Sequence, residues 1–158
     1  MAAADEAPFA DAIIVAAGTS ARMGGPDKLF ASLGGRPLLE RCLAAVAAAP
    51  EVGRIVLVVA PGREAEATAL RNGLVAAVIP GGTHRGASVE AGFRALEGLW
   101  AHDAGSAIGD SRAAIDPVVL VHDGARPLVT PALVSAVALA AATHGAAIPV
   151  VPVADTLK

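Results

Sequence analysis

Short apolar runs alternate along this chain with longer segments that have helical spacing. The runs cover residues 12–16, 54–60, 75–79, 118–122 and 147–153. Two of them contain the stretches 55–59 (IVLVV) and 118–121 (VVLV), which are apolar at every position, as expected of strands buried on both faces. This repeated β-α-β order predicts an α/β fold, a three-layer α/β/α sandwich with a mostly parallel sheet.

Apolar side chains also recur at intervals of three and four between these runs. Two sets each predict one buried helix face: Leu39, Leu43 and Val46, and Val89, Phe93, Leu96 and Trp100. Residues 101–116 show no periodicity and predict a surface loop. We expect a flexible N-terminus over residues 1–10 and one domain over residues 11–158.

Composition limits the class of protein. The chain has 158 residues, of which 54% are hydrophobic, enough for a single core. Prolines interrupt its most apolar stretch and its N-terminus is acidic, so we expect a cytoplasmic protein with no membrane span and no secretory leader. A net charge of −3 with scattered arginines argues against nucleic-acid binding, and the single Cys42 excludes an internal disulfide.

Chemically suggestive segments follow four of the predicted strands. They stand after Val15, at Gly81–Gly82, at His122–Asp123 and at Asp155–Thr156. Ligands of open α/β sheets bind at the carboxyl ends of the strands. Because these ends meet at one edge of a parallel sheet, we expect a single ligand site there.

The first of these loops has the composition of a phosphate site. Residues 16–28 (AAGTSARMGGPDK) are rich in glycine and contain Arg22 and Lys28. Exposed backbone N–H groups and two cations suit a triphosphate and its departing pyrophosphate. The loop matches neither the Walker A pattern nor the Gly-x-Gly-x-x-Gly fingerprint. Taken alone, its glycines also fit a set of turns.

Further motifs extend this pattern: 33–39 (LGGRPLL), 81–89 (GGTHRGASV), 121–127 (VHDGARP) and 153–158 (VADTLK). With them the chain resembles nucleotidyltransferases of the glycosyltransferase-A-like, Rossmann-like fold, and among these the 2-C-methyl-D-erythritol 4-phosphate cytidylyltransferase family. The resemblance covers residues 11–158. It implies transfer of a cytidylyl group from CTP to 2-C-methyl-D-erythritol 4-phosphate, with release of pyrophosphate, in non-mevalonate isoprenoid biosynthesis.

The resemblance also implies which residues bind the nucleotide: Ala16, Ala17, Gly18, Gly82, Ser88, Asp123 and Ala125. The backbone of the first three would meet cytosine and phosphate. Gly82 would allow close approach to the base, and the Ser88 hydroxyl would bond to the pyrimidine edge. Asp123 would be the ligand of a Mg²⁺ ion that bridges the phosphates.

Arg22, Lys28 and Thr156 are the implied catalytic residues. The two cations would offset the negative charge that builds up at the α-phosphate and on the leaving pyrophosphate, and Thr156 would lie near the acceptor. Simpler alternatives stay open. Ser88 also suits a helix cap, Asp123 a turn, and Thr156 the edge of a strand.

Four other polar residues near these motifs have less specific roles. Arg126 either holds a phosphate or pairs with a carboxylate that fixes its loop. His84, His102 and His144 show no metal-ligand spacing and are predicted to lie at the surface.

The chain departs from the family's pattern in three respects. Asp27 stands directly before Lys28, and Thr83 and Ala87 replace acidic residues. The family continues beyond the position of Lys158 into a dimerising arm and further catalytic residues. The chain therefore resembles a member truncated at its C-terminus, and we expect it to bind nucleotide with weak or absent transfer.

Two other functions remain alternatives. The Gly-Gly-Pro-Asp-Lys form of the first loop also resembles the molybdenum-cofactor guanylyl- and cytidylyltransferases. Truncation also fits a non-catalytic nucleotide-binding domain, since a fold of this kind hosts many functions. The sequence leaves the choice between CTP and GTP and the oligomeric state open, although the family forms homodimers.

Overall fold

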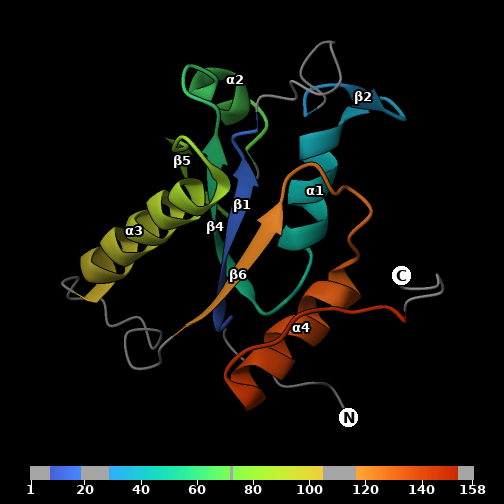
Figure 1. Cartoon of the computed structure of the whole chain (residues 1–158), viewed down its shortest axis with the longest axis vertical. Helices are drawn as coiled ribbons and strands as arrows, with labels where there is room; N and C mark the ends of the chain where they lie inside the picture. Colours follow the sequence, from blue (N-terminus) through green and yellow to red (C-terminus); the bar gives the residue numbers. More distant parts are fainter. Residues whose placement is uncertain (1–7, 19–28, 72, 105–116, 153–158) are drawn as a thin grey trace, which may run out of the picture.

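The computed structural model describes residues 8–18, 29–71, 73–104 and 117–152. The strands are β1 (Ala10–Ala16), β2 (Ser32–Leu33), β3 (Arg36–Pro37), β4 (Val52–Val59), β5 (Val75–Pro80) and β6 (Val118–Asp123). The helices are α1 (Leu38–Ala47), α2 (Glu64–Thr68), α3 (Arg85–Ala104) and α4 (Pro131–His144). The predicted alternation of strands and helices is confirmed over most of the described chain (Figure 1).

Four strands form one parallel sheet in the order β5-β4-β1-β6. β1 is central, and its Ile14 lies between Leu57 of β4 and His122 of β6. Helix α3 covers one face of the sheet, whereas α1 and α4 lie on the other side (Figure 1). The predicted three-layer sandwich is therefore confirmed, with every strand of the main sheet pointing the same way.

Alternate side chains of the strands fill the core on both faces of this sheet. On one face, Ile13 and Val56 pack with Leu96 of α3. On the other face, Ile14 belongs to the cluster that contains Leu39 of α1. Because both faces of β1 and β4 are covered, neither strand shows a polar stripe, which explains their nearly continuous apolar sequences.

The fifth predicted strand, 147–153, is wrong over the part of it that the structure describes. Residues 147–152 follow α4 without pairing to any described strand. Pro149 and Pro152 have no N–H group to donate to a ladder, and the apolar side chains at 148, 150 and 151 are 79–84% exposed. A β-branched run alone did not suffice to form a strand here.

The two longer predicted helix faces have different outcomes. The predicted residues of α1 are all buried, as expected. Helix α3 instead buries Ser88, Gly92 and Leu96. Phe93, which was expected in the core, is 41% exposed. The helix also continues through Ala104, so the loop predicted from residue 101 is wrong over its first four residues, and the rest of it lies outside the described chain.

A buried cluster of charged and aromatic groups fixes the far end of α3 to the sheet. The Asp11 carboxylate accepts hydrogen bonds from the Trp100 indole at 2.7 Å and from Arg54. Arg54 lies 3.1 Å from Asp11 and also pairs with Asp103 of α3. These contacts join β1, β4 and α3 at the edge of the sheet opposite the predicted site.

The β2–β3 hairpin was not predicted. Its turn contains Gly34 and Gly35, whose φ angles are +57° and +81°. Only glycine adopts this left-handed region without strain, as a two-residue hairpin turn requires. The Arg41 guanidinium holds the turn by donating to the carbonyls of Leu33 and Gly34 at 2.5 and 2.7 Å.

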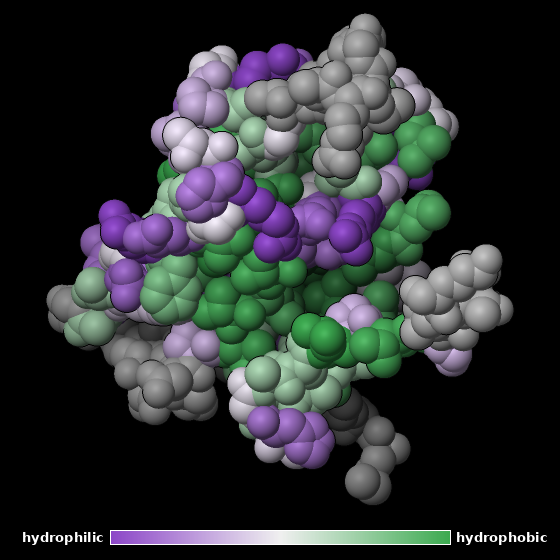
Figure 2. Space-filling view, viewed as in Figure 1, coloured by the Kyte–Doolittle hydropathy of each residue, from purple (hydrophilic) through white to green (hydrophobic). Residues whose placement is uncertain are grey.

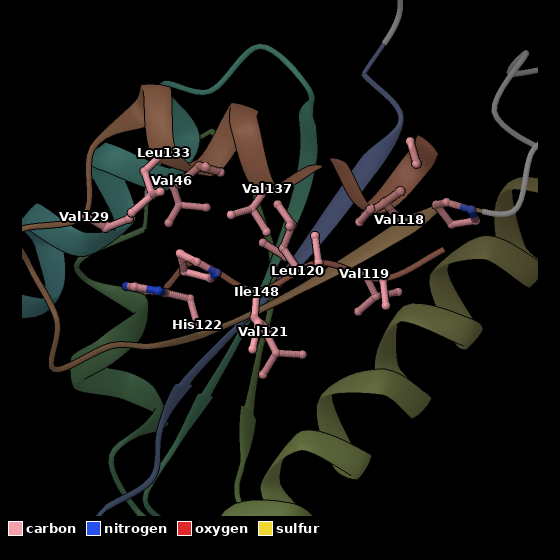
Figure 3. Close-up of a pocket in the computed structure, with 18 of the residues that line it drawn as sticks. Val46, Val118, Val119, Leu120, Val121, His122, Val129, Leu133, Val137 and Ile148 are labelled. Atoms are coloured by element: carbon pink, nitrogen blue, oxygen red, sulfur yellow. The ribbon is translucent and has the colours of Figure 1, made fainter. Parts of the chain in front are cut away.

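An apolar groove of about 670 Å³ lies between β6, α4 and the segment that follows α4. Leu120, Val137 and Ile148 point into it (Figure 3), and hydrophobic side chains dominate this part of the surface (Figure 2). Within the described residues, β6 pairs only with β1.

No described helix has both the length and the apolar character needed to cross a membrane.

Candidate active site

A pocket of about 600 Å³ opens at the carboxyl ends of β1, β5 and β6, beside the first turns of α3. Its lining residues are Val15, Ala16, Ala17, Gly18, Leu29, Gly82, Thr83, His84, Arg85, Ser88, Asp123, Ala125 and Arg126. All seven residues predicted to bind nucleotide are among them. The predicted catalytic residues Arg22, Lys28 and Thr156 lie outside the described chain.

Glycines let the walls of this pocket approach one another closely. A Cβ atom on Gly81 would lie 2.4 Å from the Ala17 Cβ and 2.8 Å from the Ser88 Oγ. A Cβ atom on Gly82 would lie 2.5 Å from the Ala87 Cβ. Because methyl groups bonded directly to the backbone cannot rotate away, any side chain at either glycine would push β5 away from β1 or α3.

Ser88 joins the loop after β5 to the helix that follows it. Its hydroxyl accepts a hydrogen bond from the Gly82 N–H at 3.2 Å and donates to the His84 carbonyl at 3.2 Å. The helix cap is instead His84, whose Nδ1 accepts from the Ala87 N–H at 3.1 Å. The capping alternative for Ser88 is therefore wrong. Its hydroxyl is buried at the edge of the pocket, and these two hydrogen bonds fix its position.

The three histidines predicted at the surface, His84, His102 and His144, are all exposed, so that expectation is confirmed. The cap made by His84 was not predicted. The sequence feature that could have indicated this cap is a side chain with a hydrogen-bond acceptor directly before the helix. Histidine, however, is not among the usual cap residues.

Two arginines hold the carboxylate of Asp123. The Nε and Nη2 atoms of Arg85 both lie 3.0 Å from its Oδ1, and the Nε of Arg126 lies 3.1 Å from its Oδ2. Of the two alternatives for Arg126, the structure shows the carboxylate pair. Arg85 belongs to a predicted motif, but no role was predicted for it.

Cys42 shows how far the pocket's charge acts into the core. Its thiol is buried on α1, and burial first, then the negative charge of Asp123, raises its pKa to about 12. The thiol is therefore protonated at neutral pH and unreactive. Cys42 is a core residue.

The pocket offers little protein ligation for a metal ion. Asp123 is the one carboxylate among the described lining residues. Over residues 8–18, 29–71, 73–104 and 117–152, no three His, Cys, Asp or Glu side chains cluster as a metal site. Mg²⁺ is commonly held by one or two carboxylates together with substrate phosphates, so this donor set would hold such an ion weakly by itself and more tightly with a phosphorylated ligand.

The comparisons with known proteins agree with this geometry. The family model described as 2-C-methyl-D-erythritol 4-phosphate cytidylyltransferase (IspD) matches residues 10–158. The chain belongs to this family. The resemblance noted in the sequence is thereby confirmed over its whole predicted extent, residues 11–158.

Two curated relatives show how much of the family the chain represents. It is 46% identical to a bifunctional enzyme IspD/IspF of Desulforudis audaxviator, covering 93% of this chain and 34% of that one. It is 41% identical to the 2-C-methyl-D-erythritol 4-phosphate cytidylyltransferase of Pelotomaculum thermopropionicum, covering 93% of this chain and 58% of that one. The chain thus spans about a third to three fifths of these relatives.

Solved structures give the same fold. The 4-diphosphocytidyl-2C-methyl-D-erythritol synthase of Anaerococcus prevotii is 31% identical, with a TM-score of 0.57 over 85% of this chain and 51% of that one. A second 4-diphosphocytidyl-2C-methyl-D-erythritol synthase reaches a TM-score of 0.69 over 96% of this chain and 63% of that one, at 23% identity. The second likeness supports the fold alone.

Proposed function

We propose that this chain carries the nucleotide-binding part of a cytidylyltransferase that transfers a cytidylyl group from CTP to 2-C-methyl-D-erythritol 4-phosphate. One observation carries the proposal. Seven residues assigned to nucleotide binding from the sequence, on three strand ends and one helix, line a single pocket at the expected edge of the sheet. The cytidylyltransferase relatives support the same activity.

The geometry around β5 suits a flat base. Gly81 and Gly82 present backbone with no side chain in the way, and Ser88 adds one hydroxyl at a fixed position. In the proposal the backbone of Ala16 and Ala17 meets the opposite edge of the cytosine. Backbone groups and small side chains let a flat base approach the wall closely, and the proposal assigns that place to cytosine.

Asp123 would hold Mg²⁺ at the end of β6. Bound there, the ion would neutralise part of the phosphate charge, as in other phosphoryl transfers. Arg22 and Lys28 are proposed to stabilise the charge that develops when an acceptor phosphate oxygen attacks the α-phosphorus. The bond from that phosphorus to the bridging oxygen then breaks, and pyrophosphate leaves. Thr156 is proposed to lie near the acceptor.

The substrates in this proposal are small phosphorylated molecules in the cytoplasm. The net charge of −3 supports small-molecule substrates over nucleic acid, because an acidic protein has no general attraction for nucleic acid. Homodimer formation, which the resemblance implies, stays a prediction.

The proposal is tested by equilibrium binding of CTP in the presence of Mg²⁺. Ser88→Ala should weaken binding about fivefold to tenfold, since a hydrogen bond to a ligand contributes about 1 kcal/mol. Ser32→Ala, at an exposed serine on β2 outside the pocket, is the matched control and should bind as the wild type does. Equal affinity of Ser88→Ala and the control would contradict the proposed base site.

A further inference from the structure

Both oxygens of the Asp123 carboxylate have cationic partners in the pocket. Arg85 donates a hydrogen bond from Nε to Oδ1, its Nη2 also lies 3.0 Å from that oxygen, and the Nε of Arg126 lies 3.1 Å from Oδ2. A divalent cation needs at least one of these oxygens. A metal ion that binds at Oδ1 therefore competes with the Arg85 guanidinium for that oxygen.

The two arginines differ in how they are attached. Arg126 belongs to the turn that follows Asp123, and its N–H donates to the Asp123 carbonyl at 3.0 Å. Its own carbonyl lies 3.2 Å from His122 Nε2, so the backbone of this turn is held in place. Arg85 reaches Asp123 from the first residue of α3, and both arginine side chains are exposed, by 61% for Arg85 and 74% for Arg126. Rotation of the Arg85 side chain alone therefore frees Oδ1.

We propose that Arg85 is a removable counter-ion of Asp123, which competes with the divalent cation for Oδ1 until the metal ion and nucleotide enter. The proposal rests on the proposed function of Asp123 as a metal ligand. Exposed ion pairs are weak and easily exchanged, so this contact can screen the carboxylate without blocking the site. Once displaced, the guanidinium remains at the pocket wall, where nucleotide phosphates need positive charge.

The test is Mn²⁺ binding without nucleotide, followed by the electron paramagnetic resonance signal of the free ion. Asp123→Asn defines the background from other surface carboxylates. Arg85→Gln should bind Mn²⁺ about twofold to fivefold more tightly than the wild type, the range expected when an exposed ion pair is removed. Arg94→Gln makes the same charge change further along α3, where Arg94 pairs with Glu90, and should match the wild type.

The possible outcomes distinguish the counter-ion role of Arg85 from the metal-ligand role of Asp123. If Asp123→Asn binds Mn²⁺ as well as the wild type does, Asp123 is not a metal ligand and the proposed function fails at that point. If Asp123→Asn loses the site but Arg85→Gln equals the wild type or binds more weakly, only the counter-ion proposal is overturned. An equal gain in Arg94→Gln would also overturn it, because general charge would then explain the effect.

Discussion

Gly92 determines how closely α3 packs on the sheet, and therefore where Ser88 and Arg85 stand. It is buried on the inner face of the helix. A Cβ atom there would lie 2.5 Å from the Ile13 Cγ2 and 3.2 Å from the Val58 Cγ2. Carbon atoms in contact prefer about 3.5–4.0 Å, so Gly92→Ala forces an overlap of roughly 1 Å with fully buried strand residues.

The size of the effect follows from a comparison within the same helix. Gly98 is exposed, and a Cβ atom there meets nothing within 4 Å. Both Gly→Ala changes gain about 1 kcal/mol of helix propensity, so that gain cancels between them. Overpacking costs about 1–3 kcal/mol. We expect Gly98→Ala to be stabilised by about 1 kcal/mol and Gly92→Ala to be about 2 kcal/mol less stable than Gly98→Ala.

Urea unfolding followed by circular dichroism measures both free energies of unfolding. CTP affinity provides a second readout, because a helix pushed away from the sheet also displaces Ser88 from Gly82. Gly92→Ala should therefore bind CTP more weakly than Gly98→Ala does. Equal stability of the two alanine variants would refute the close packing of α3 on β1 and β4.

Three further predictions concern the scaffold. Thr130→Ala should lose about 1 kcal/mol in urea unfolding, because the Thr130 hydroxyl caps α4, whereas Thr130→Ser should lose little; an unchanged alanine variant would contradict the cap. Arg54→Met should lose about 3 kcal/mol in the same assay, since it removes the Arg54 guanidinium from the buried Asp11 carboxylate, and a neutral result would contradict a stabilising role of this ion pair. Burial raises the pKa of Cys42 in the folded chain from its ordinary value of 9.0 to about 12, so its contribution to stability is complete below pH 9 and is lost as the pH rises toward 12. Wild type should therefore lose more stability than Cys42→Ala over that pH range, and parallel losses would contradict the raised pKa.

Four of the five expected strands could be predicted because each is a short run of apolar residues, although only β1 and β4 are buried on both faces, whereas β5 and β6 are mostly half-buried. The exception, 147–153, carries the same β-branched residues but two prolines, and it has no neighbouring strand in the described chain. Strand formation depends on a partner, which a single sequence does not reveal. The β2–β3 hairpin was not predicted for another reason. Its strands have two residues each, which is too short for a periodic pattern of apolar residues.

In the candidate site, likewise, some features could be predicted from the sequence and others could not. Pocket positions such as Gly82 and Asp123 could be predicted, because strand ends converge in any parallel sheet and the motifs mark them. The pairing of Arg85 with Asp123 could not, since the two residues are 38 positions apart on α3 and β6. Their contact depends on how closely the helix packs, which follows from the glycine at position 92 and not from either motif.

The central claim is that this pocket binds cytidine triphosphate. It is tested most directly by calorimetric titration of the chain with Mg·CTP beside Mg·GTP, repeated on Lys28→Ala after its fold has been checked by circular dichroism. We expect preferential binding of CTP and a large loss of that affinity in Lys28→Ala. Preference for GTP, or no binding of either nucleotide by the folded chain, would contradict it.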